Sequence, residues 1–231
     1  MIVQHDGPNR TAMDLQMSHY DETYFSWQKA WGEFGGAANL LKFANYIQPH
    51  DVVLDFGCGG GYLLSNIRCA RKVGVEINPD ARQQSARAGI EVFGSLAELP
   101  DHSIDVAISN HALEHVHHPL GEIASLVKKL KPGGLAIFVV PCENVWHRFE
   151  ANDVNQHLFS WGPMCLGNLF AAAGFEVVES KRYVHTWPRG FRAIQRWFGW
   201  RVFHIVCRIY GAFSFGVGQV RIVARTAERH A

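Results

Sequence analysis

Four histidines and a glutamate crowd the stretch "ISNHALEHVHHP", residues 108–119. His111, Glu114 and His115 have the spacing H-x-x-E-H, which some zinc proteases carry on a helix. Imidazole and carboxylate groups can ligate a metal, and an imidazole can also take a proton from a reacting group near neutral pH. The elements around the motif must decide between these two chemistries.

A glycine cluster, "LDFGCGGGY" at residues 54–62, is the second stretch with chemical potential. Glycines allow a sharp turn and let a ligand approach the backbone. The dinucleotide fingerprint G-x-G-x-x-G would need a glycine where Tyr62 stands, and the phosphate-binding pattern G-x-x-x-x-G-K-[ST] is absent. The alternative is a purely structural role, in which the glycines only form a tight turn between a strand and a helix.

Apolar runs alternate with helix-like segments along most of the chain, and the pattern predicts a doubly wound α/β fold. The predicted strands are 51–56, 72–77, 90–95, 104–109, 134–140, 175–183 and 219–226. The predicted helices are 62–71, 78–89, 119–134 and 161–174, with further helices in 22–47 before the first strand. In such sheets ligands bind beyond the carboxyl ends of the strands, where both motifs fall.

This position decides how H-x-x-E-H is interpreted. A buried strand ends one residue before Asn110, and Pro119 follows four residues after His115. That leaves no long helix on which both motif histidines could share one face. We therefore predict a ligand-binding loop at residues 110–118 and no metal site.

The pattern D-x-G-x-G-x-G at residues 55–61 resembles the first motif of the class I S-adenosylmethionine-dependent methyltransferases. The resemblance covers residues 24–226, through "VGVEINP", "SLAELPDHSIDVAISNHALEHV", "LKPGGLAIFVVP" and "QVRIVAR" in the family's order. It implies a Rossmann-like sheet of seven strands, mostly parallel with an antiparallel last strand. N-terminal helices and a helical insertion before the last strand complete the expected fold.

The resemblance also implies the residues that bind the cofactor, S-adenosylmethionine. Its methionine part would lie at Asp55, Gly57, Cys58, Gly59 and Gly61, its ribose and adenine at Glu76, Ile77, Ser95 and Leu96, and its sulfur near Asn110 and His111. Ser95 departs from the family pattern, in which the third strand often ends in Asp, so the adenine contact at that position is open.

A hydroxyl acceptor of the methyl group benefits from a base that takes its proton. His111 is the first candidate, His157 the second and His115 the third; for each, a structural histidine is the alternative. The expected reaction is O-methylation of a small-molecule, sugar or lipid-linked glycan acceptor. The alternative is a catalytically silent S-adenosylmethionine-binding regulatory protein on the same fold.

Composition places the expected enzyme in the cytoplasm. The chain has 231 residues, 48% of them hydrophobic and 19% charged, and begins without the pattern of a secretory signal. Its five cysteines show no C-x-x-C spacing, which favours reduced thiols. We expect one structural domain with an N-terminal helical lid (1–48), a cofactor-binding core (49–183), a basic aromatic helical insertion (184–218) and a last strand with a tail (219–231).

Charge is divided unevenly along the chain. Residues 1–180 hold 12 Lys/Arg and 20 Asp/Glu, a difference of −8, whereas residues 181–231 hold 10 and 1, a difference of +9. Residues 187–216 contain nine aromatics and five arginines with no acidic residue. This insertion, whose helix is predicted to bend at Gly199, is predicted to be either an amphipathic lid or a peripheral contact with the inner face of the membrane or with a lipid-linked substrate. The acidic remainder argues against a nucleic-acid partner.

The aromatic residues near the N-terminus can also be interpreted as a lid. Tyr24, Trp27, Trp31 and Phe34 precede the pair Gly35-Gly36. They are predicted either to cover the cofactor or to form a helix that faces the core.

Overall fold

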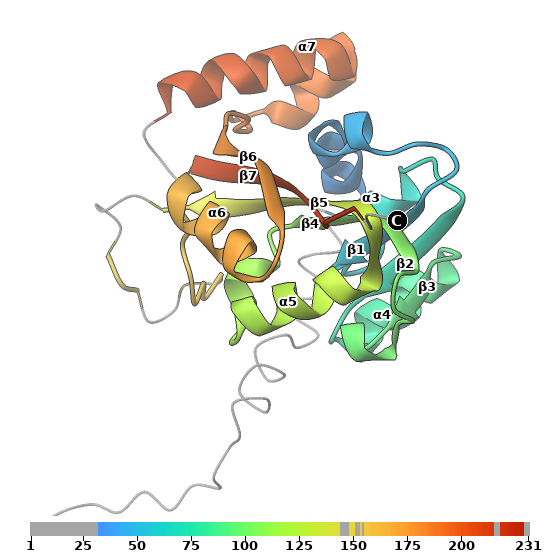
Figure 1. The fold of residues 1–231 in the computed structure, drawn as a ribbon. Helices are drawn as coiled ribbons and strands as arrows, with labels where there is room; N and C mark the ends of the chain where they lie inside the picture. The colour runs from blue at the N-terminus through green and yellow to red at the C-terminus, as the bar shows by residue number, and fades with distance from the viewer. Residues whose placement is uncertain (1–31, 144–147, 151–152, 154, 215–217, 229–231) are drawn as a thin grey trace, which may run out of the picture.

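A computed structural model describes residues 32–143, 148–150, 153, 155–214 and 218–228. Its centre is one seven-stranded sheet in the order β3-β2-β1-β4-β5-β7-β6 (Figure 1). The strands are β1 (Val52–Phe56), β2 (Arg71–Val75), β3 (Glu91–Phe93), β4 (Ile104–Asn110), β5 (Leu130–Cys142), β6 (Glu176–Tyr183) and β7 (Gly218–Arg225). β7 runs antiparallel to both β5 and β6, and the other pairs are parallel. The predicted fold class is confirmed.

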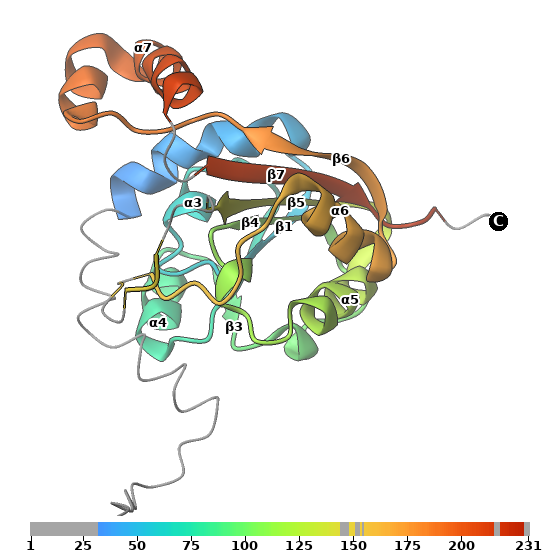
Figure 2. The ribbon, with the colours of Figure 1, turned by 90° about the vertical axis from the view of Figure 1, so that its left-hand side faces the viewer.

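Both faces of the sheet are covered, which explains the near-continuous apolar runs of the central strands. Val53 of β1 joins the core cluster that contains Phe43 and Leu64, whereas the next residue, Leu54, joins the cluster that contains Leu126 and Phe170. α5 (Pro119–Lys129) and α6 (Pro163–Ala172) therefore lie on one face. α3 (Tyr62–Ser65) and the segment after residue 32 lie on the other (Figure 2).

Local sequence accounts for the ends of the helices. α4 (Pro79–Arg87) begins with proline at a position that needs no N–H donor, and Asn78 Oδ1 accepts hydrogen bonds from the backbone of Asp80 and Ala81. α3 is a single turn rather than the predicted 62–71. The side-chain amide of Asn66 donates to the Tyr62 carbonyl at 2.8 Å, and its backbone N–H bonds Leu63. In a continuing helix the backbone N–H of Asn66 would donate to the Tyr62 carbonyl. The Asn66 side chain occupies that carbonyl instead, and the helix ends there.

The helix over residues 32–39 packs against α7 (Phe191–Phe213), which joins β6 to β7. Phe34 has ring contacts with Trp187, Phe191, Trp200 and Phe203. The described part of the predicted N-terminal lid thus faces a hydrophobic cluster. Tyr24, Trp27 and Trp31 lie outside the described residues.

α7 carries the break that the sequence predicts at Gly199. Its backbone there has φ 76° and ψ 175°, far from helical values, so two helical segments meet at this glycine. Within the described residues, no helix combines the length and the apolar character needed to cross a membrane.

Candidate active site

The glycine loop after β1 adopts a backbone that side chains would oppose. Gly57, Gly59 and Gly61 have φ of +75°, +52° and +77°, the left-handed region that favours glycine. A Cβ atom on Gly57 would collide with the side chain of Ala112 in the loop after β4. The two predicted loops therefore meet at the carboxyl edge of the sheet.

Two carboxyl groups flank this loop, one buried and one partly buried. Asp55, the fourth residue of β1, is 3% exposed, and Glu76 directly follows β2. Glu76 accepts hydrogen bonds from the backbone N–H of Gly59 at 2.9 Å and of Asn78 at 2.8 Å. Burial raises the pKa of both carboxyls, and the nearby charge of Glu76 raises that of Asp55 further.

This pair fits the polar parts of S-adenosylmethionine. A buried carboxylate is stabilised by a neighbouring cation or by hydrogen-bond donors. The ammonium of the methionine part would supply a cation near Asp55, and the ribose hydroxyls would supply hydrogen-bond donors near Glu76. The glycine loop would let the methionine carboxylate come close to backbone N–H groups.

Cys58 has a structural position. Its side chain is 7% exposed, its Sγ lies 3.7 Å from Ser85 Oγ, and it packs where a side chain on Gly74 would stand. Burial raises the pKa of its thiol. The side chain therefore belongs to the core beneath the loop, and only the backbone of Cys58 faces the predicted cofactor site.

The residues predicted beside adenine differ in what they offer. Ile77 is 44% exposed just beyond β2, which leaves its side chain free for an apolar contact with a base. Ser95 is exposed and its hydroxyl donates to Glu98 at 3.2 Å. Leu96, the first residue of the short helix η3 (Leu96–Glu98), is buried in the core. Its contribution to a ligand is thus restricted to the backbone.

A buried lysine that the sequence prediction missed lies at the end of β4. Lys42, in the short helix η1 (Leu40–Lys42), is 3% exposed. Its ammonium donates to Asn110 Oδ1 at 2.7 Å and to Gln219 Oε1 at 2.6 Å. Burial lowers the pKa of Lys42 to about 7, and the negative charge of Glu114 acts in the opposite direction. The only sequence signal was a single lysine within the apolar run "LLKFA".

His111 has a left-handed backbone, with φ of 57°, directly after β4. Its Nε2 lies 3.4 Å from Gln219 Oε1 and its Nδ1 lies 3.5 Å from Glu114 Oε1. Burial, and then the charge of Lys42, lower the pKa of His111 well below its ordinary value. The shift favours the neutral imidazole, and both ring nitrogens face protein groups.

Glu114 is the central residue of the helix η4 (Leu113–His115), and its side chain has no solvent exposure. Neither carboxyl oxygen has a hydrogen-bond partner among the described residues. Burial raises the pKa of Glu114 to about 8. A buried polar group without a partner is costly, so this carboxyl group marks a place where a ligand can supply the missing hydrogen bond.

His157 reaches this carboxyl group from the segment between β5 and α6. The carbonyl of Glu114 accepts hydrogen bonds from the backbone N–H of Leu158 at 3.0 Å and of Phe159 at 3.2 Å. This anchor brings His157 Nε2 to 3.9 Å from Glu114 Oε1, while Nδ1 lies 2.7 Å from Glu143 Oε1. Sequence reasoning missed Glu143, because the segment between it and His157 has no regular period.

The structure groups the motif residues differently from a zinc protease. Ligand atoms of Glu114, His115 and His157 lie within 4.8 Å of one another and could hold a metal ion. His115 also stacks edge to face against His157, with ring centroids 5.1 Å apart. The motif therefore contributes Glu114 and His115 to this group, and the third member comes from another part of the chain.

A family model described as a methyltransferase domain matches residues 31–180, which is more than half of the chain. The chain therefore belongs to this methyltransferase family. The class predicted from the sequence, a class I S-adenosylmethionine-dependent methyltransferase, is confirmed together with its cofactor.

Individual relatives are distant. The chain is 31% identical to a ubiquinone biosynthesis O-methyltransferase of Nitrosococcus oceani over 149 residues, 57% of this chain and 61% of that protein. It is 32% identical to an uncharacterized methyltransferase of Mycolicibacterium vanbaalenii over 48% of this chain and 42% of that one. The chain thus spans about three fifths or less of these two relatives.

Solved structures with low identity share the fold. A possible histamine N-methyltransferase of Thermotoga maritima aligns with a TM-score of 0.64 at 17% identity, covering 91% of this chain and 99% of that one. A 1,6-didemethyltoxoflavin-N1-methyltransferase of Burkholderia thailandensis, bound to its acceptor and S-adenosylhomocysteine, aligns with a TM-score of 0.63 at 20% identity. That alignment covers 99% of this chain and 94% of the other.

Proposed function

We propose that this chain methylates a hydroxyl oxygen of a small-molecule, sugar or lipid-linked glycan acceptor, with His157 as the base. The observation that carries the proposal is the pair formed by His157 and Glu143 beside the loop after β4. A carboxylate that accepts from Nδ1–H leaves Nε2 with a lone pair, the arrangement in which histidine takes a proton from a hydroxyl.

The other residues of the site have positioning roles in this proposal. Lys42 holds the side chain of Asn110 through its 2.7 Å hydrogen bond, which steadies the loop that follows β4. Glu114, with a raised pKa and no partner among the described residues, can donate a hydrogen bond to the acceptor. His157 Nδ1 has a carboxylate oxygen of Glu143 at 2.7 Å, whereas the carboxylate oxygen beside His111 Nδ1 lies at 3.5 Å, so the geometry favours His157 ahead of His111.

When bound, S-adenosylmethionine would supply a methyl group on a positively charged sulfur: the acceptor oxygen would bond to the methyl carbon while the carbon–sulfur bond breaks, and S-adenosylhomocysteine would leave. The protein holds the two reactants in line and excludes water, and both effects lower the barrier. His157 Nε2 takes the proton of the attacking hydroxyl. Glu143 fixes the orientation of the imidazole and stabilises the positive charge that the imidazole gains.

A metal bound by Glu114, His115 and His157 is the competing use of the same residues. It would occupy His157 Nε2 and prevent that nitrogen from acting as a base. We expect activity to be unchanged after dialysis against EDTA, because the proposed mechanism needs no metal. Loss of activity that added zinc restores would contradict the role of His157 as a base and assign the group to metal binding.

The reaction itself can be tested in a cell extract of the source organism with S-adenosylmethionine radiolabelled in the methyl group. Label should enter a product that mild base does not release, as expected for a methyl ether, and mass spectrometry of that product identifies the acceptor. A variant with Glu76→Ala serves as the cofactor-binding control. No transfer by a chain that binds S-adenosylhomocysteine would instead indicate the catalytically silent regulatory protein.

A further inference from the structure

The outward side of α7 is apolar, whereas the exposed side of a helix in a soluble protein is usually polar. Its exposed residues Val202, Ile205, Ile209 and Phe213 recur at intervals of three and four and so share one side of the helix. We call these four residues the outer face of α7. Ile209 is 57% exposed and Phe213 is 78% exposed, so the described residues leave this face uncovered. Trp197 and Phe198, before the break at Gly199, extend the exposed apolar surface.

The opposite side of α7 is fixed to the protein. Phe203, Cys207 and Gly211 are buried and recur at intervals of four residues. The backbone N–H of Thr186 donates to the Cys207 carbonyl at 3.2 Å, and Arg182 donates to the Gly211 carbonyl at 3.1 Å. These contacts hold the helix as a platform whose apolar outer face points away from the sheet, and they oppose the movement of a lid.

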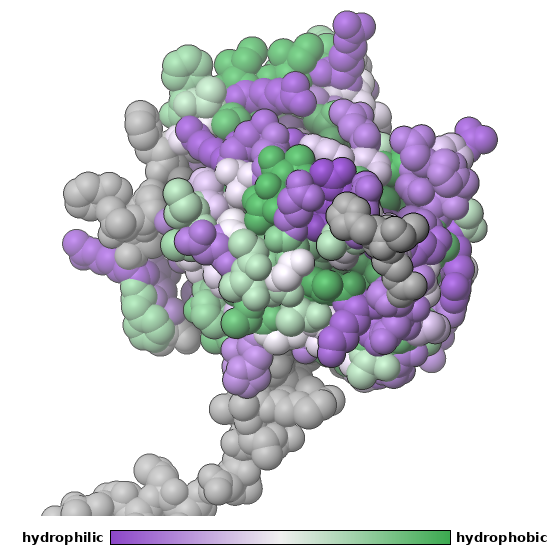
Figure 3. Space-filling view, viewed as in Figure 1, coloured by the Kyte–Doolittle hydropathy of each residue, from purple (hydrophilic) through white to green (hydrophobic). Residues whose placement is uncertain are grey.

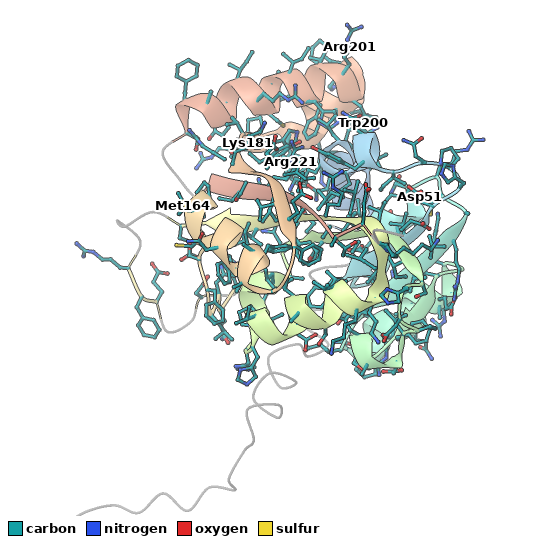
Figure 4. The ribbon with its side chains drawn as sticks, in the orientation of Figure 1. Asp51, Met164, Lys181, Trp200, Arg201 and Arg221 are labelled. Atoms are coloured by element: carbon teal, nitrogen blue, oxygen red, sulfur yellow. The ribbon has the colours of Figure 1, made fainter. Side chains whose placement is uncertain are left out.

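Arginines border the outer face. Arg196 and Arg201 are exposed, and residues 187–216 contain no acidic residue. Figure 4 shows Arg201 pointing away from the molecule, whereas Trp200 lies on the side toward the N-terminal helix. In Figure 3, green hydrophobic residues lie over α7 at the top of the molecule with purple residues beside them.

We infer that the outer face of α7 docks this protein onto an anionic membrane surface. An exposed apolar stripe bordered by arginines suits a helix that lies in the headgroup region, with apolar side chains in the bilayer and guanidinium groups near lipid phosphates. Pairing of two copies through the same face is disfavoured, because a symmetric contact would bring the arginines of both copies together.

The docking helix is connected to the site through a series of polar contacts. His204 of α7 lies 3.0 Å from His185, whose carbonyl accepts from Gln219 at 2.9 Å. Gln219 Oε1 in turn accepts from Lys42, which holds Asn110. These contacts connect α7 to the end of β4, and the inference does not depend on the identity of the acceptor.

Co-sedimentation with vesicles tests the inference without any measurement of turnover. We expect the full chain to sediment with vesicles of phosphatidylcholine and phosphatidylglycerol at low salt, and to be released at high salt. Binding to phosphatidylcholine alone should be much weaker, because the arginines then lack anionic lipid. A wild-type protein that stays in the supernatant with anionic vesicles at low salt would overturn the inference.

Variants separate the charged and apolar contributions. Arg196→Glu with Arg201→Glu should weaken vesicle binding on the order of 30-fold or more, since each reversal removes one attraction and adds one repulsion. Arg192 is left intact because its guanidinium lies over the Phe34 ring, 5.5 Å from the centroid. Ile205→Ser with Ile209→Ser should weaken binding at both salt concentrations, because it removes apolar contact.

A matched control makes the same change in net charge elsewhere. Arg68→Glu with Lys128→Glu reverses two exposed positive charges outside α7 and should leave vesicle binding close to wild type. Equal loss in this control would mean that total charge, rather than α7, drives binding. A dimer in sedimentation velocity that Ile205→Ser with Ile209→Ser abolishes would assign the outer face to a second copy instead.

Discussion

His157→Ala should lower kcat by about 10²–10⁴-fold at saturating S-adenosylmethionine, the range expected when a general base is removed. The affinity for S-adenosylhomocysteine should stay within about threefold of wild type, because the imidazole takes part in proton transfer and not in cofactor binding. Methyl transfer to the acceptor identified by radiolabelling gives kcat, and isothermal titration calorimetry gives the affinity.

Three further variants make the assignment specific. Glu143→Gln keeps the size of the side chain and removes its charge, so it should lower kcat less than His157→Ala does. His117→Ala changes an exposed histidine nearby and should have no effect on kcat. His111→Ala should leave most of the activity. If His111→Ala alone lowers kcat by the larger factor, the base is His111 and the 2.7 Å contact between His157 and Glu143 is structural.

Glu76→Ala should weaken S-adenosylhomocysteine binding by roughly 1–3 kcal/mol, which corresponds to about 5- to 150-fold in Kd. The substitution removes the charged acceptor for the ribose hydroxyls and the partner of the Gly59 backbone N–H. Gly59→Val should weaken binding more, because φ there is +52° and a branched side chain disfavours that backbone. Calorimetric titration measures both effects.

Glu91→Ala is the control for Glu76→Ala. Glu91 lies on the neighbouring strand β3 and forms an exposed ion pair with Arg71, so its removal changes the same net charge outside the site. We expect its Kd to equal that of wild type. Thermal unfolding of each variant shows whether a loss of binding comes from a loss of the fold. A folded Gly59→Val and a folded Glu76→Ala with unchanged Kd would place the cofactor elsewhere.

Features of the site that depend on neighbours in sequence were predictable. The glycines of the loop after β1 and the acid after β2 could be located because a buried strand, a turn and a following helix each leave a local pattern. The break at Gly199 and the antiparallel last strand were also expected, and both are observed. The short length of α3 was not expected, because it depends on one hydrogen bond from the Asn66 side chain to the Tyr62 carbonyl.

Features that depend on long-range packing were not predictable. Lys42 and Gln219 are 177 residues apart and meet at 2.6 Å only because the N-terminal segment covers the sheet beside β7. Glu143 and His157 are brought together by the hydrogen bonds between the Glu114 carbonyl and the segment at 158–159. Neither pair has a spacing that a sequence pattern could reveal.

The sequence by itself determined the doubly wound sheet and the edge at which ligands bind, because periodicity and glycine positions act locally along the chain. The class of protein came from the resemblance of its motifs to a known family. Only the tertiary structure decided which distant residues join the H-x-x-E-H motif, with Gln219 beside His111 and His157 beside Glu114. It also decided which side of α7 stays exposed, since an apolar stripe in a sequence looks the same whether it faces the core or the solvent.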